Sequence, residues 1–231
     1  MIHGSVTKFG QAEGSAMRKE FIFEKDVGFE SCHASTLVEL PDGDILAAWF
    51  GGKEEGDPSV KIWMSRRSAS GWSKPTIVAQ EDGVPCWNPV LYLDAKQRVW
   101  LFYKAGPNPE QWSGIYVIST DGGQTWGEKN HLPAGLLGPI KNKPITLSSG
   151  EILCGTSVES WRAWTCWAEI IHPRTSEWTR HGPIAVKGEN YGLIQPTLWE
   201  LEPQHVRAFM RSTRRIGYIC RADSLDGGRT W

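Results

Sequence analysis

Side chains that could do chemistry are concentrated in short polar segments between apolar runs. The segment GGKEEGDPS (51–59) holds three carboxyl groups, Glu54, Glu55 and Asp57, and RSTRR (211–215) holds three guanidinium groups. A carboxyl group with a raised pKa can donate a proton to a leaving oxygen. A guanidinium group binds a carboxylate through two parallel hydrogen bonds. These residues would suit acid–base chemistry on a negatively charged ligand.

Two further polar segments and several isolated residues enlarge this set. The segments KAGPNPEQWSG (104–114) and SVESWRAW (157–164) combine aromatic and polar side chains. Six residues stand at or just before the start of an apolar run: His33, Trp87, Asn88, Asn142, Lys143 and Gln195. His33 could bind an anion or act as a base near neutral pH, or it could be a structural histidine. The acidic segment could equally be a solvated loop.

An internal repeat explains why these segments recur. Four similar apolar units occupy residues 35–50, 89–104, 144–159 and 196–211. A shared leucine recurs at steps of 53 or 54 residues, at Leu40, Leu93, Leu147 and Leu201. Each unit is followed by a second apolar run and then by a tryptophan, at Trp72, Trp126, Trp178 and Trp231. A fixed period of this length indicates a repeat architecture.

The repeated unit is predicted to be made of β-strands. Its apolar runs are short, rich in Val, Ile, Leu and Trp, and separated by turn sequences such as PDG, SSG and DGG. No window keeps a helical period of apolar residues. Four strands in each repeat predict the blade of an all-β propeller. We expect EFIFE (20–24) to be a further extended strand that could close a last blade.

An octet, Ser-x-Asp-Gly-Gly-x-Thr-Trp, occurs at residues 119–126 and again at 224–231. Asp and Gly-Gly suit a tight turn, and Thr and Trp can hold that turn on the blade. SASGW (68–72) and RTSEW (174–178) look like worn copies. We therefore assign the octet a structural role.

This octet is the Asp-box, or BNR repeat. Together with SCHASTLVELPDGDILAAWFGG and IWMSRR, it makes the chain resemble the sialidase (neuraminidase) superfamily, and within it the bacterial predicted-neuraminidase type. The resemblance covers roughly residues 30–231. It implies a six-bladed β-propeller of which four blade repeats are present, so that this chain is a fragment. It also implies that the boxes lie on the face opposite the ligand funnel.

The resemblance implies a role for several candidates. Asp57, which precedes VKIWMSRRS, is similar in position to the family's acid/base aspartate, with Glu54 and Glu55 as competitors. Arg211, in VRAFMRS, resembles the second of three arginines that bind the sialate carboxylate, and Arg214 or Arg215 could assist it. Substrate contacts are expected from Arg211, Arg215, Glu55, Asn88, Lys143 and Trp161.

Two positions depart from the family pattern. His33, in CHAST, stands where the first arginine is expected, and Gln195, in IQPTL, stands where a glutamate polarises the tyrosine nucleophile. Because Gln cannot ionise, it cannot activate a phenol as a carboxylate does. The nucleophile and the third arginine would lie beyond Trp231. Tyr191 does not match the nucleophile's position, and we interpret it as a loop aromatic.

Three functions follow from these residues. The first is a glycoside hydrolase acting on a terminal, acidic or unusual sugar, with Asp57, His33 and Gln195 in the catalytic centre and Arg211 holding an anionic group. The second is a non-catalytic carbohydrate-binding propeller that has lost the Tyr/Glu couple. The third is a lyase acting on a uronic-acid glycan, with His33 as the base.

Composition sets the remaining expectations. The chain has 231 residues, 40% of them hydrophobic, and a net charge of −1, so we expect one domain over residues 20–231 and neither nucleic acid nor a membrane as partner. Residues 1–19 are expected to form an N-terminal extension without required order. No segment resembles a signal peptide or a membrane span, which favours a cytoplasmic protein. The five cysteines form no paired motif, and we expect neither metal nor cofactor.

Overall fold

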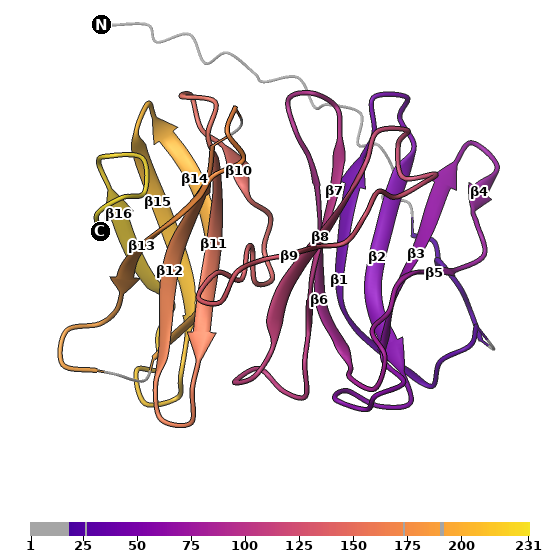
Figure 1. Ribbon diagram of the computed structural model, residues 1–231, viewed down its shortest axis with the longest axis horizontal. Coiled ribbons are helices and arrows are strands. Elements are labelled where there is room, and N and C mark those ends of the chain that lie inside the picture. Colours follow the sequence, from indigo (N-terminus) through magenta and orange to yellow (C-terminus); the bar gives the residue numbers. More distant parts are fainter. Residues whose placement is uncertain (1–18, 26, 173, 190–191) are drawn as a thin grey trace, which may run out of the picture.

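The computed structural model describes residues 19–25, 27–172, 174–189 and 192–231. Within these ranges the regular structure consists of sixteen strands and no helix. The strands form four antiparallel sheets that follow one another along the chain (Figure 1). The all-β expectation is therefore confirmed, and the sheets are the four blades predicted from the repeat.

In each blade the strands pair in chain order, from the innermost strand outward. Blade 1 contains β1 (Ser31–Glu39), β2 (Ile45–Gly52) and β3 (Lys61–Ser68), with an outer strand divided into β4 (Gly71–Trp72) and β5 (Thr76–Ala79). Blade 2 contains β6 (Cys86–Leu93), β7 (Val99–Ala105), β8 (Ser113–Ser119) and β9 (Asn130–His131). Blade 3 contains β10 (Ile145–Thr146), β11 (Ile152–Glu159), β12 (Trp164–Ile171) and β13 (Trp178–Ile184). Blade 4 contains three strands, β14 (Leu193–Glu202), β15 (His205–Ser212) and β16 (Cys220–Ser224).

The core lies between neighbouring blades because both faces of each sheet are apolar. Side chains on a strand alternate between faces, and in β2 Leu46, Ala48 and Phe50 point towards blade 2, where they join one buried cluster. A second cluster joins blades 2 and 3, and a third joins blades 3 and 4. Face-to-face burial of this kind requires each blade to have a neighbour, which sets the order of the blades in space.

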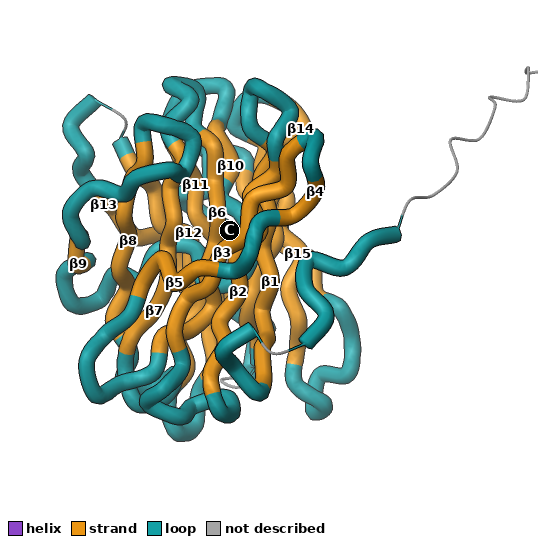
Figure 2. The backbone as a smooth tube through the Cα atoms, turned by 90° about the vertical axis from the view of Figure 1, so that its right-hand side faces the viewer, coloured by secondary structure: helices purple, strands orange, loops and turns teal. Residues whose placement is uncertain are grey.

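Loops gather at the two ends of the strands, as the turned view in Figure 2 shows. One end, which we call the box end, holds the Asp-box turns and the hairpins between the first two strands of each blade. The other, which we call the site end, holds the loops after β2, β7, β11 and β15 together with the starts of the innermost strands. In Figure 1 the arrowheads of β2 and β11 point to the site end. The boxes are thus opposite the loops that carry the candidate residues, as predicted.

The intact box is a turn that satisfies its own polar groups. The carboxylate of Asp121 accepts hydrogen bonds from the backbone N–H of Thr125 at 2.9 Å and from its hydroxyl at 2.5 Å. Ser119 Oγ donates to Asp121 at 2.7 Å and accepts from Gly123 N at 2.7 Å. These bonds lower the pKa of Asp121, chiefly through the Thr125 hydroxyl. Gly123, at φ +82°, packs its backbone against Leu46 of blade 1, so the turn also ties two blades together.

The segment 20–24 is not a strand, which corrects the sequence-based expectation. It pairs with no strand of the described chain but crosses blade 1 on the face away from blade 2. Phe23 packs on Trp49 with ring centroids 5.3 Å apart, and Glu20 pairs with Arg67. Aromatic packing, rather than a ladder of backbone hydrogen bonds, holds the segment in place. Residues 1–18 and Tyr191 lie outside the described residues, so the expectations for them are not addressed.

Candidate functional site

A β-bulge opens three of the four innermost strands at the site end. The pairing register shifts between His33 and Thr36, between Trp87 and Val90, and between Ile194 and Thr197. At each bulge one residue other than glycine has a positive φ: 56° for Ala34, 42° for Asn88 and 56° for Gln195. Residues other than glycine rarely adopt this conformation, and bulges of this kind occur next to binding sites, where they redirect a side chain.

A row of aromatic side chains runs across the site end from blade 1 to blade 2. The ring centroids of His33 and Phe50 are 5.7 Å apart, those of Phe50 and Trp87 are 6.2 Å apart, and those of Trp87 and Trp112 are 5.9 Å apart. Trp87 is buried and its indole N–H donates to Gly106 O at 2.8 Å. Fixed aromatic faces beside polar groups are typical of pockets that bind small molecules.

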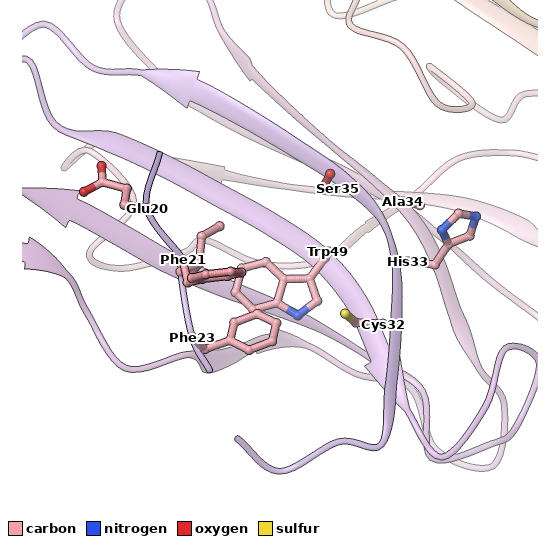
Figure 3. Close-up of a pocket in the computed structure, with 9 residues that line it drawn as sticks. Glu20, Phe21, Phe23, Cys32, His33, Ala34, Ser35 and Trp49 are labelled. Atoms are coloured by element: carbon pink, nitrogen blue, oxygen red, sulfur yellow. The ribbon is translucent and has the colours of Figure 1, made fainter. Parts of the chain in front are cut away.

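His33 is exposed and lies at the start of this row. It also contributes to a hollow of about 420 Å³ on blade 1, together with Cys32 and Trp49. Figure 3 shows the imidazole of His33 turned away from Phe21, Phe23 and Trp49, which occupy the other end of this hollow. The ring of His33 lies instead beside Phe50, away from the aromatic cluster under the N-terminal segment.

Asp57 lies in the loop between β2 and β3, beside a hollow of about 500 Å³ that Lys53 and Ser59 also line. Its carboxylate accepts a hydrogen bond from Ser59 N at 2.8 Å. Hydrogen bonds from Ser59 hold the pKa of Asp57 below its usual value. The raised pKa that we expected of a proton donor is absent here, because the loop solvates the ionised form. Glu55, in the same loop, is exposed.

Gln195 is held by its neighbours in blade 3. Its backbone N–H donates to Ser157 Oγ at 3.4 Å, and its carbonyl accepts from Asn142 Nδ2 at 2.9 Å. Asn142 also donates to Pro196 O at 3.2 Å. These contacts fix the bulge at Gln195 and bring the starts of two innermost strands together.

Lys143 lies close to blade 1 although it belongs to blade 3. It lines a hollow of about 450 Å³ with Lys141, Asn142, Ser35 and Thr36, among others. Partial burial lowers the pKa of both lysines. Neither lysine has an ion-pair partner among the described residues, and the hollow that they line is also lined by the acidic residue Glu20.

The arginines of the RSTRR segment differ in their partners. Arg211, the residue of β15 that pairs with Ile194 of β14, is exposed and has no ion pair within the described part of the chain. Arg215 instead pairs with Glu189 at 2.9 Å. Of these two candidates, Arg211 is the one whose guanidinium group is available to an anion.

The loop between β11 and β12 presents an exposed aromatic face. The side chain of Trp161 is 79% exposed, and the guanidinium carbon of Arg162 lies 5.1 Å from its ring centroid. An exposed indole at the rim of a site can stack on the apolar face of a sugar.

Glu159 was missed as an individual candidate, although it stands inside the quoted segment SVESWRAW. It ends β11, and burial raises the pKa of its carboxyl group, while Arg211 acts in the opposite direction and Glu110 reinforces the rise. No pattern in the sequence marks it, since a glutamate at a strand end is ordinary. Its environment depends on blades 2 and 4.

Two buried ionisable residues were also missed, and they have structural partners. Lys104 Nζ donates to Pro139 O at 2.9 Å, and Glu169 accepts from Gly138 N at 2.6 Å. Burial lowers the pKa of Lys104 to about 8 and raises that of Glu169 to about 7. Both side chains hold the segment between blades 2 and 3.

No group of three or more His, Cys, Asp or Glu residues within the described ranges is placed to hold a metal ion. No helix in that part of the chain could cross a bilayer.

The described residues form four blades of a β-propeller. Structural Asp-box turns lie at one end of the blades, and a polar surface lined by aromatic residues lies at the other. The sequence profile of the BNR repeat-like domain matches residues 43–231, and the chain belongs to this family. Among curated proteins, none matches the chain.

Solved structures show the same fold at low sequence identity. A protein of unknown function from Dyadobacter fermentans aligns with a TM-score of 0.73 and 16% identity over 89% of this chain and 68% of its own. The leech intramolecular trans-sialidase aligns with a TM-score of 0.73 and 14% identity over 96% of this chain and 53% of its own. The NanB sialidase from Streptococcus pneumoniae aligns with a TM-score of 0.72 and 13% identity over 92% of this chain and 53% of its own. The chain thus has the propeller fold of sialidases and spans about half the length of those two enzymes.

Proposed function

We propose that this chain provides most of a glycan-active site that hydrolyses a terminal, acidic sugar. The observation that carries the proposal is Arg211, an exposed guanidinium group at the site end with no ion pair among the described residues. A planar guanidinium group binds a carboxylate through two hydrogen bonds. The aromatic row of blades 1 and 2, at the same end of the propeller, supplies apolar surface for a sugar ring.

The other site residues have roles consistent with this proposal. Asp57 is a carboxylate that stays ionised, and it could stabilise positive charge at the anomeric carbon or accept a proton from water. His33, Asn88 and Lys143 could bind hydroxyl or carboxylate groups, and Trp161 could stack on a sugar. Glu55 and Arg215 would lie at the rim, where Arg215 exchanges its pairing with Glu189 for the ligand.

Gln195 favours a substrate other than a sialoside, or binding without turnover. A neutral amide at this position cannot activate a tyrosine nucleophile as a carboxylate would. A non-catalytic carbohydrate-binding propeller is therefore the second candidate.

The experiment is a comparison of aryl glycosides as substrates of the intact protein. We expect hydrolysis of an aryl glucuronide, tested as both anomers, and only background turnover of an aryl sialoside. Robust sialoside hydrolysis would contradict our interpretation of Gln195. Binding of glucuronate-terminated glycans without turnover of any aryl glycoside would establish the binding function instead.

A further inference from the structure

The innermost strand of blade 3 is much shorter than those of the other blades. β10 has two residues, whereas β1, β6 and β14 have nine, eight and ten. Residues 137–143, which we call the entry segment, precede β10 at the site end and belong to no strand. The entry segment bonds to β11 from Ile140 N to Gly155 O at 3.1 Å. A ladder of backbone hydrogen bonds therefore does not fix this part of the site end.

Two buried ionisable side chains hold the first half of the entry segment instead. The carboxylate of Glu169, on β12, accepts from Leu137 N at 3.1 Å and from Gly138 N at 2.6 Å. Lys104 Nζ, on β7, donates to Pro139 O at 2.9 Å. Both side chains are fully buried. Three successive residues of the segment thus each have a backbone group bonded to an ionisable side chain, from blade 3 or from blade 2.

The second half of the entry segment belongs to the candidate site. Ile140 packs in a buried cluster with the two tryptophans of the aromatic row. Asn142 Nδ2 donates to Gln195 O at 2.9 Å, and Lys143 lines the hollow that blade 1 shares. A displacement of the segment would therefore move Lys143 and would disturb both the aromatic row and the bulge at Gln195.

Stability by itself does not account for these two buried groups. Burying an ionisable group costs free energy, and apolar side chains of similar volume often replace buried ion pairs without loss of stability. Hydrogen bonds with an ionised partner are, however, shorter and stronger than neutral ones. Because buried backbone groups need partners, Lys104 and Glu169 specify one position for a segment that has no ladder to specify it.

We propose that Lys104 and Glu169 are positioning residues of the candidate site. They hold the backbone of residues 137–139, and the chain that follows then places Asn142 against the Gln195 carbonyl and Lys143 at its hollow. Neither buried residue needs to touch a sugar. The effect on ligand binding rests on the proposed function, whereas the placement of the entry segment can be measured without a ligand.

The first part of the test uses nuclear magnetic resonance of the intact protein without ligand. Lys104→Met keeps most of the side-chain volume but removes the donor, and Glu169→Gln removes one of two acceptor oxygens. We expect each variant to shift the signals of the Ile140 backbone amide and the Asn142 side-chain amide. Ser119→Ala, a destabilising change at the box end, is the matched control and should leave both signals in place. Unmoved signals in the folded Lys104 or Glu169 variant overturn the positioning role.

The second part measures affinity for methyl glucuronide, supplied as both anomers, by titration calorimetry. Lys104→Met should weaken binding by about tenfold, and Ser119→Ala should not weaken it. Combined with Lys143→Met, the loss should be smaller than the product of the two single losses, because Lys104 acts through Lys143. Combined with Arg211→Ala, on another blade, the two losses should multiply.

The outcomes separate this inference from the proposed function. Losses that multiply in the variant combining Lys104→Met with Lys143→Met overturn the positioning role, even if methyl glucuronide binds well. Absence of methyl glucuronide binding by the unsubstituted protein overturns the proposed function, and the signals of Ile140 and Asn142 then decide the positioning role by themselves.

Discussion

The two ends of the propeller differ in how completely the chain satisfies its own polar groups. At the box end, the side chains of Ser119, Asp121 and Thr125 bond to one another and to the turn backbone. At the site end, Arg211 and Glu159 have no side-chain hydrogen bond within the described residues, and Asn88 and Gln195 hold unfavourable backbone conformations.

This difference assigns stability to one end and ligand chemistry to the other. Closed hydrogen-bond networks stabilise a fold, whereas open polar groups and unusual backbone angles persist where a ligand can use them. Variants at the two ends should therefore separate the two properties.

The largest effect is expected from Arg211→Ala, measured as the affinity for a glucuronate-terminated glycan by titration calorimetry. Loss of a charge-assisted contact in a partly desolvated site should weaken binding by about 2–5 kcal/mol. The free energy of unfolding should change by less than about 0.5 kcal/mol, since the side chain is exposed. Arg98→Ala removes the same charge near the box end and should leave affinity unaltered. Equal losses in the two variants would show that net charge, and not a clamp at Arg211, governs binding.

The second effect concerns Glu169, a buried carboxyl group that accepts hydrogen bonds from the backbone, in contrast to the polar groups of the site end that have no partner within the described residues. Glu169 keeps its proton up to a pKa of about 7 when folded, against 4.5 when unfolded. Between these values the folded state binds more protons, so stability falls as pH rises, by an amount on the order of 3 kcal/mol. Glu169→Gln should flatten this part of the curve of unfolding free energy against pH.

Comparing the slope of unfolding free energy against pH in the parent protein with that in Glu169→Gln separates the contribution of Glu169 from those of other groups that titrate in the same pH range. The lowered pKa of His181 acts in the opposite direction within this window, and the raised pKa of Glu159 acts in the same direction. Both contribute equally to the parent protein and to the variant. An unchanged slope in Glu169→Gln would contradict the buried environment that we assign to this carboxyl group.

The smallest effect tests the box end itself. Ser119→Ala removes a buried hydroxyl that bonds Asp121 and Gly123 N, and should lower the free energy of unfolding by about 1–3 kcal/mol. Ser68→Ala is the matched control in a worn box, where within the described residues Ser68 Oγ hydrogen-bonds only to the exposed turn residue Ser70. This substitution should lower the free energy of unfolding by less than about 0.5 kcal/mol. Chemical denaturation measures both values. A fall in glycan affinity without a fall in stability would place the box in the binding surface.

The features predicted well from the sequence are those made by neighbouring residues. The apolar runs of the strands and the 53- or 54-residue period predict four blades, and the octet predicts a tight turn. The family resemblance adds that this turn lies at the end opposite the site. The bonds of the box join residues only two to four positions apart, so that no distant partner is needed to infer them.

The features predicted poorly depend on contacts with residues that are distant in the sequence. EFIFE has the aromatic and β-branched residues that strands favour, yet Phe23 packs on Trp49 and the segment pairs with no strand of the described residues. The assignment of Asp57 as the proton donor stays a prediction, although hydrogen bonds from Ser59 lower the pKa of this carboxyl group instead of raising it. The burial of Glu159 could not be predicted, because a single glutamate at a strand end has no distinctive pattern.

The sequence by itself determined the strands, the period and the box turns, because alternation and short-range hydrogen bonds are written in consecutive residues. Only the tertiary structure decided which polar groups remain open and which carboxyl group is desolvated. Burial raises the pKa of Glu159, the charge of Glu110 in blade 2 reinforces the rise, and that of Arg211 in blade 4 opposes it. Electrostatic interactions depend on distance in space and on exclusion of water, and neither can be read from positions along a chain.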